Sequence, residues 1–113
     1  MKRIVPTPFP TDPEVRDAAM LGAAVRSART ASGLSIQDAA LAIGIAKQTL
    51  SNLEAGKPSV GLGLSLRIAR ELGVTLLAVP TATAEVARRR ISDQMPSNPA
   101  IADRREQRKR RAP

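Results

Sequence analysis

Apolar residues recur at helical spacing through the middle of the chain, and a glycine follows each of four such stretches. The glycines stand at positions 33, 44, 56 and 73, and helices commonly end on a glycine in the left-handed conformation. Within the first stretch, Leu21, Val25 and Ala28 keep the spacing of one helix face. The pattern therefore predicts four helices, at residues 11–32, 36–43, 47–55 and 60–72.

Capping signals mark the starts of the first two predicted helices. The segment from Thr11 to Glu14 offers a capping side chain, a proline for the first turn and an acid near the positive end of the helix. The segment from Ser35 to Asp38 has the pattern of a capping box, in which the hydroxyl and the carboxylate each bind a free backbone N–H. These signals predict helix starts near residues 13 and 36.

The third and fourth predicted helices are amphipathic. Leu50 and Leu53 should point inward beside Ile45, while the outer face of the third helix is polar. That outer face consists of Lys47, Gln48, Ser51 and Asn52. The fourth helix is expected to bury Leu62, Leu66, Ala69 and Leu72.

A short run of apolar and β-branched residues follows the fourth helix, ends at Pro80 and predicts one strand. A lone strand exposes unpaired N–H and C=O groups, so it calls for a partner. We expect it to pair with the same strand of a second copy in a two-fold homodimer. The alternative is that this segment folds back on its own helical core. The predicted dimer strand consists of Val74, Thr75, Leu76, Leu77, Ala78 and Val79.

Composition excludes several kinds of chemistry. The 113 residues include no His and no Cys, which excludes Cys- or His-based zinc sites, Ser-His-Asp triads and disulfides. One Phe is the whole aromatic content, whereas proteins that bind single strands stack bases on aromatic rings. Paired acids and Gly-rich phosphate loops are also missing, so we expect no enzyme, no cofactor and no metal.

The charge points to a polyanionic partner. Eighteen Lys and Arg against ten Asp and Glu give a formal net charge of +8, and a strongly basic protein is first to be tested against nucleic acid. No apolar run approaches the roughly 18 residues of a membrane span, and no signal peptide precedes the prolines near the N-terminus. The sequence predicts a soluble, cytoplasmic protein without a membrane partner.

Two short helices joined by a glycine turn, the second with a polar outer face, have the arrangement of a helix-turn-helix. Gly44 accepts a positive φ, and Ile45 is the apolar residue that fixes the crossing angle. Lys47 can donate to guanine, and the amides of Gln48 and Asn52 can pair with adenine. The alternative is that these residues form an ordinary solvated helix face.

The spaced residues of this segment resemble the XRE family of helix-turn-helix proteins, to which the lambda repressor and Cro belong. The similarity covers about residues 20–73 and includes Gly33-Leu34-Ser35, Gly44-Ile45 and Thr49 to Pro58. The last helix followed by a strand resembles the HipB-like antitoxins. The resemblance implies an all-α bundle of four to five helices, like that of the lambda repressor, with one short C-terminal strand that pairs in a dimer.

The resemblance also implies a role for individual residues. Arg29 and Glu54 match a structural ion pair of the family. Ile36 stands where the family usually has Gln, and the site of Ala46 usually carries a capping Ser or Thr. The base-reading positions are Ala46, Lys47, Gln48 and Asn52. The phosphate-contacting positions are Gln37, Thr49, Ser51 and Lys57.

The chain is thus expected to have three parts: a flexible N-terminal arm at 1–12, a DNA-binding and dimerisation domain at 13–80, and a basic, largely disordered tail at 81–113. Leu41, at a position usually polar in the family, is either a stray exposed side chain or a contact for the arm or a partner. The favoured function is a sequence-specific repressor of double-stranded, palindromic DNA. By resemblance it is an antitoxin that also neutralises a HipA-like kinase toxin. The alternatives are an XRE-type regulator without a toxin and a non-specific, basic nucleic-acid-binding protein.

Overall fold

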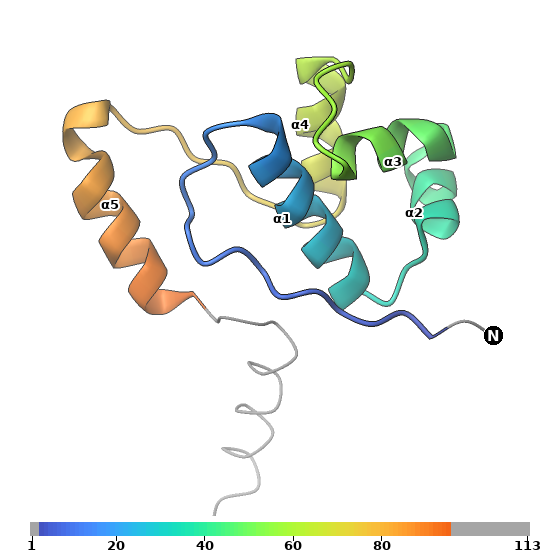
Figure 1. The fold of residues 1–113 in the computed structure, drawn as a ribbon, viewed down its shortest axis with the longest axis horizontal. Coiled ribbons are helices and arrows are strands. Elements are labelled where there is room, and N and C mark those ends of the chain that lie inside the picture. Colours follow the sequence, from blue (N-terminus) through green and yellow to red (C-terminus); the bar gives the residue numbers. More distant parts are fainter. Residues whose placement is uncertain (1–2, 96–113) are drawn as a thin grey trace, which may run out of the picture.

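The computed structural model describes residues 3–95, and this part of the chain folds into five helices without a strand (Figure 1). The predicted fold class, an all-α helix-turn-helix bundle of four to five helices, is therefore confirmed. The helices are α1 (Ala18–Ala31), α2 (Ile36–Ile43), α3 (Lys47–Glu54), α4 (Leu62–Glu71) and α5 (Thr81–Gln94).

The core lies where α1, α2, α3 and α4 meet. Val25, Leu50 and Ile68 are completely shielded from solvent there. At Gly22, α1 passes so close to the end of α3 that a methyl group on the glycine would lie 2.7 Å from the carbonyl oxygen of Glu54. The crossing of α1 over α3 thus depends on the smallest side chain. The remaining buried apolar residues are Ala24, Ala39, Ala40, Ile43, Leu53, Ala69 and Val74.

The predicted start of the first helix is wrong. The carboxylate of Asp12 does accept the N–H of Glu14 at 2.9 Å, as a capping side chain would, but no helix follows. Instead α1 begins at Ala18, and Asp17 is its cap, accepting the N–H of Met20 at 2.9 Å. Arg16 reaches back to Asp12 at 2.8 Å, which holds this segment as a turn. An acid and a proline are common to both kinds of turn, so the pattern could not separate them.

The second helix has the predicted bounds. The N–H of Asp38 donates to the hydroxyl of Ser35 at 3.0 Å, which is the hydroxyl half of the expected capping box. At the other end Gly44 has φ +83°, a left-handed conformation that side chains other than glycine rarely adopt. The turn after α2 is therefore set by its glycine, as predicted.

The predicted inner face of the fourth helix is partly wrong. Ala69 is buried and Leu72 is half-buried, but Leu62 and Leu66 are 74% and 40% exposed. Their place in the core is taken by Ile68 and by Ser65, whose hydroxyl donates to the carbonyl of Gly61 at 2.8 Å. A serine that binds its own helix backbone can be buried at little cost, so apolar spacing alone misplaced this face.

The predicted strand at 74–79 is not formed within the single chain. Val74 is buried and its N–H donates to Ala69 at 2.8 Å, while the backbone of residues 75–79 makes no hydrogen bond to another segment of the described chain. Leu76 packs against the core, whereas Leu77 and Val79 are exposed. A strand needs a neighbouring strand, so this run forms a linker here.

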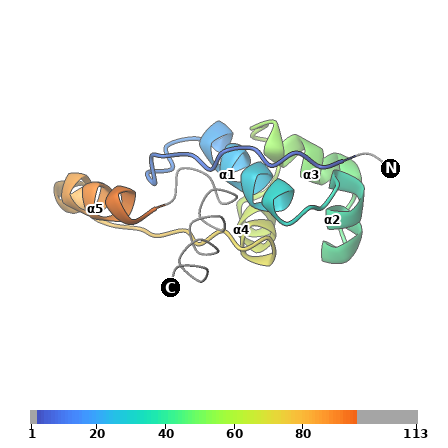
Figure 2. The same ribbon diagram turned by 90° about the horizontal axis from the view of Figure 1, so that it is seen from below.

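Both ends of the described chain are more ordered than predicted. The arm follows α1: Thr7 accepts a hydrogen bond from Ser27 at 2.8 Å and donates to Thr30 at 3.0 Å, and Phe9 packs on the core (Figure 2). The first residues of the expected disordered tail form α5, which includes the cluster from Arg88 to Arg90. The second basic cluster, at residues 108–111, lies outside the described residues.

Candidate nucleic-acid interface

The helix-turn-helix is formed by α2, the turn at Gly44 and α3. Leu50 and Leu53 are buried on the inner side of α3, and Ile45 in the turn packs against the core, as predicted. On the opposite side of α3, Lys47 and Gln48 are exposed. The sequence-predicted reading face therefore points to solvent.

Two residues of that face are joined. The Nε2 of Gln48 donates to the Oδ1 of Asn52 at 2.9 Å, one helical turn further along α3. An amide nitrogen carries two hydrogens, so Gln48 keeps one N–H and its own oxygen for a further partner. That donor and acceptor suit adenine in the major groove, and Asn52 restricts the direction in which Gln48 points.

The N-terminus of α3 lacks a capping side chain. Ala46 occupies the cap position in an extended conformation and makes no side-chain hydrogen bond. The first N–H groups of a helix are positively polarised and free to bind an anion. Alanine thus leaves this end of α3 open, as the sequence indicated.

The predicted phosphate-contacting residues surround the same face. Gln37 and Lys57 are exposed, and Thr49 and Ser51 are half-exposed. Gln37 lies in the first turn of α2, and Lys57 follows α3, with its N–H bound to Asn52 at 3.0 Å. These four residues therefore come from both helices of the motif and from the loop behind it.

A buried ion pair holds α3 on α1, as predicted. The guanidinium of Arg29 donates to both carboxylate oxygens of Glu54, at 2.7 and 2.9 Å, and only 7% and 6% of the two side chains are exposed. Arg29 also donates to the carbonyl of Leu34 at 2.6 Å. One side chain of α1 thus fixes both the end of α3 and the loop before α2.

Arg67 is a positioning residue that the sequence did not reveal. From α4 it donates to the carbonyl of Ile43, the last residue of α2, at 2.7 Å. This bond satisfies a free carbonyl at the helix end and ties α4 to the turn before α3. The two residues are 24 positions apart, and no spacing rule pairs residues at that distance.

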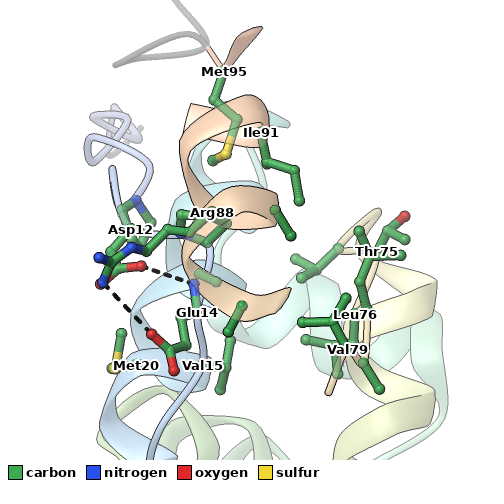
Figure 3. A pocket seen from close by; sticks show the side chains of 18 of the residues that line it. Asp12, Glu14, Val15, Met20, Thr75, Leu76, Val79, Arg88, Ile91 and Met95 are labelled. Carbon is green, nitrogen blue, oxygen red and sulfur yellow. Dashed lines mark hydrogen bonds and ion pairs between the residues drawn. The ribbon is translucent and has the colours of Figure 1, made fainter. Parts of the chain in front are cut away.

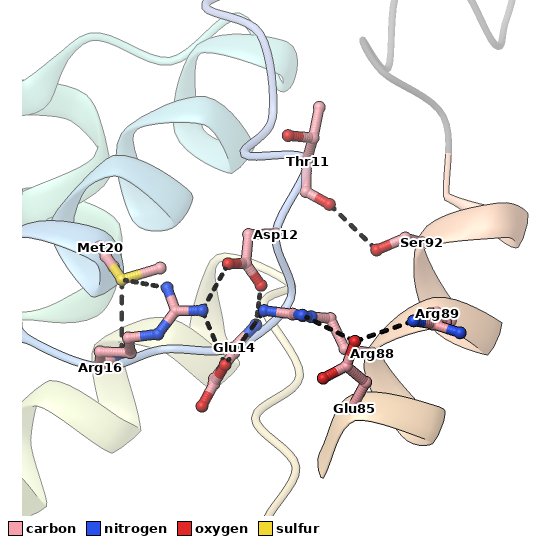
Figure 4. Close-up of polar contacts among 9 residues, drawn as sticks. All are labelled: Thr11, Asp12, Glu14, Arg16, Met20, Glu85, Arg88, Arg89 and Ser92. Carbon is pink, nitrogen blue, oxygen red and sulfur yellow. Dashed lines mark hydrogen bonds and ion pairs between the residues drawn. The ribbon is translucent and has the colours of Figure 1, made fainter.

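A second polar cluster lies on the segment before α1 and on α5 (Figure 4). Arg16 donates to Glu14 at 2.7 Å as well as to Asp12, Arg88 lies 3.7 Å from Glu14, and Ser92 donates to the carbonyl of Thr11 at 3.3 Å. The N–H of Glu14 and, after it, the guanidinium of Arg16 lower the pKa of Asp12. The carboxylate of Asp12 in turn raises the pKa of Arg16. This cluster connects α5 to the N-terminal segment.

Neither metal-binding clusters nor membrane helices occur in the described part of the chain. Within residues 3–95, no three Asp, Glu, His or Cys side chains lie close enough to hold a metal ion. None of the helices formed by these residues is long and apolar enough to cross a membrane.

The comparisons with known proteins agree with the geometry. A turn glycine between two short helices, with a polar outer face on the second, defines a helix-turn-helix domain. The model of the helix-turn-helix family matches residues 25–79. The domain formed by these residues therefore belongs to the XRE-type helix-turn-helix family, as the sequence resemblance implied.

Two solved structures have this fold. One is a HipB variant in complex with a 20-mer called O2, and the other is HipB in complex with a 20-mer called O4. Each has a TM-score of 0.54 and 22% sequence identity over 60% of this chain, and they are covered to 94% and 96% of their own length. The likeness shows that the fold is HipB-like. Among curated proteins, no sequence matches this chain at a significant level.

Proposed function

We propose that this protein is a transcriptional repressor that reads double-stranded DNA with α3. The observation that carries the proposal is the exposed polar face of α3, with Lys47, Gln48 and Asn52, directly after the glycine turn. Groove-length donors and acceptors on a helix held by a packed turn are what base recognition requires. The XRE-type family of the domain and the HipB complexes with 20-mers support the same function.

In this proposal Ala46, Lys47, Gln48 and Asn52 contact base edges, and Ala46 can pack against a thymine methyl group. Residues of both helices and of the following loop contact phosphates and set the register of α3 on the duplex. The phosphate contacts come from Gln37, Thr49, Ser51 and Lys57.

The proposed repressor is a homodimer that binds a palindromic operator. A single short α3 reads few base pairs, and two copies related by a two-fold axis double the site. The linker residues from Val74 to Val79 leave backbone groups without partners in the single chain, which supports an additional contact between copies. The two reading helices would then lie about 34 Å apart, or at a multiple of that distance.

The test compares binding of the full-length protein to a palindromic fragment of its own promoter and to scrambled DNA at one salt concentration. Lys47→Ala and Gln48→Ala should each lose about 1–3 kcal/mol of binding free energy on the palindrome and little on scrambled DNA. Gln94→Ala, an exposed glutamine on α5, is the matched control. Equal losses on both DNAs would contradict base reading by α3.

The same measurement separates this function from a non-specific nucleic-acid-binding protein. The wild-type chain should prefer the palindrome by about 10³-fold or more. A ratio near one would favour the non-specific alternative, in which the net charge of +8 dominates.

The antitoxin role is the finer part of the proposal. The HipB-like fold of the domain favours an antitoxin that represses its own operon and holds a HipA-like kinase, over a regulator without a toxin. Co-expression with the product of the neighbouring gene tests it: a stable complex that still binds the palindrome supports the antitoxin. A chain that binds DNA but no kinase-like neighbour would be a stand-alone regulator.

A further inference from the structure

A cleft of about 370 Å³ separates α5 from the rest of the molecule (Figure 3). Its walls come from the arm, from the linker and from α5, and Phe9, Leu76 and Ile91 represent the three. Folded cores are close-packed, with few voids larger than a water molecule. An apolar cleft of this size is therefore an unfilled surface of the chain.

Helix α5 has too little contact with its own chain to account for its stability. None of its residues is buried, and the half-buried ones, including Ala84, Ala87 and Ile91, lie three and four positions apart on the side that lines the cleft. An isolated helix of 14 residues is marginal in water. An apolar stripe on such a helix calls for a packing partner.

Apolar side chains also project from this region into solvent. Leu77 on the linker is 72% exposed, and Val86 on α5 is 57% exposed. On the other side of the linker, Leu66 of α4 borders a second, smaller hollow that shares Val74 and Leu76 with the cleft. The region therefore has both apolar hollows and apolar projections, and contiguous exposed apolar surface marks interaction sites.

Charge is complementary in the same way. The segment before α1 brings Asp12 and Glu14 to one edge of the cleft, while α5 carries three successive arginines, 88 to 90. Within the chain Arg88 reaches Glu14 only at 3.7 Å, so the two edges are weakly engaged. A patch with hollows and projections, and with acids and bases, can bind a copy of itself about a two-fold axis.

We propose that the linker and α5, residues 74–95, form a dimerisation surface that docks reciprocally into the cleft of a second copy of this chain. The projecting side chains of one copy fill the cleft of the other, and the arginines of each α5 face the acids of its partner. This inference rests on the proposed homodimer and names its surface, with helix packing added to the linker. It does not depend on DNA binding.

Sedimentation of the full-length protein without DNA tests the proposal. The wild type should be a dimer, and Val86→Asp should raise the dimer dissociation constant about tenfold or more because the interface would bury an unpaired charge. Leu77→Asp should do the same. Leu62→Asp is the matched control, since Leu62 is 74% exposed on α4, outside the cleft. All three side chains are exposed in the single chain, so its fold should tolerate each change.

Crosslinking gives a second measurement. The chain has no cysteine, so Val86→Cys can be joined only to another copy by a short bismaleimide, and Leu62→Cys should remain uncrosslinked. A dimer that is insensitive to Val86→Asp would place the interface elsewhere, for example in strand pairing of the linker alone, and would overturn the proposal. A wild type that stays monomeric would overturn it too, as would a monomer whose cleft binds an apolar dye.

Failure here and failure of the proposed function are distinguishable. If the surface is wrong but DNA binding is right, the Asp variants remain dimers and Lys47→Ala still loses palindrome affinity. If DNA binding is wrong, the wild type shows no preference for the palindrome whatever its oligomeric state.

Discussion

Gly22 shows how a single residue determines the packing of two helices. A side chain there would meet the carbonyl oxygens of Leu53 and Glu54, which belong to backbone and cannot rotate away. We expect Gly22→Ala to lower the free energy of unfolding by about 1–3 kcal/mol, because α1 and α3 would have to separate. Urea unfolding followed by circular dichroism measures the difference.

Gly63 provides the control for this prediction. It lies within α4, and a methyl group there would meet nothing within 4 Å. Gly63→Ala should therefore stabilise the protein by about 0.5–1 kcal/mol through helix propensity alone. If both alanine variants gained stability, the close crossing at Gly22 would be wrong.

Asp12 allows a prediction about protonation. Its pKa lies below the ordinary value of 3.8 because the N–H of Glu14 and then Arg16 stabilise the carboxylate. A lowered pKa in the folded state contributes stability above the ordinary value, and this is lost as the pH falls through the folded value. The loss is therefore confined to pH below about 4.

A carboxyl titration by NMR measures this pKa directly. Arg16→Ala should raise the pKa of Asp12 only part of the way to 3.8, because the hydrogen bond from Glu14 remains and is the larger cause. A return to the full ordinary value would instead make Arg16 the dominant partner.

At the level of elements, the sequence predicted best where a local signal and its consequence lie within one turn of helix. Ser35 and Gly44 define α2 in this way, and both bounds of that helix are confirmed. The reading face of α3 is predicted for the same reason. The start of α1 and the inner face of α4 were mispredicted because Arg16 and Ser65 settle them through hydrogen bonds that apolar spacing does not register. Arg67 had no local signal at all.

The ion pair between α1 and α3 leads to a prediction for both elements. Glu54→Gln would leave the buried Arg29 without a counter-charge and should cost about 3–5 kcal/mol. Replacing both residues with apolar ones, Arg29→Met with Glu54→Leu, should recover most of that loss, since no charge is then buried alone. Thermal unfolding of the wild type and the two variants makes the comparison.

The remaining hydrogen bond of Arg29 sets the limit of that recovery. The double variant still loses the donor to the carbonyl of Leu34, which is worth about 1 kcal/mol. Equal stability of the wild type and Glu54→Gln would mean that the pair does not hold α3 in place.

At the level of the whole molecule, the chain separates two tasks. The helix-turn-helix and the cluster that ties α5 to the segment before α1 lie on different elements, α2 and α3 on one side and α5 on the other (Figure 1). A surface for a second copy on the linker and α5 would leave the outer face of α3 free. Because the proposed dimer fixes the separation of its two reading helices, DNA binding should depend on the phase of the half-sites.

Operators with altered spacing test this dependence. Inserting about five base pairs between the half-sites rotates one by half a turn of duplex and should reduce affinity to that of a single half-site, because the second α3 then faces the wrong side. Inserting about ten restores the facing but not the distance, so affinity should recover only where the linkers reach. Val86→Asp should bind all spacings alike, since its two copies are no longer coupled. Strong binding by the wild type at every spacing would mean that the reading helices are not held in a fixed dimer.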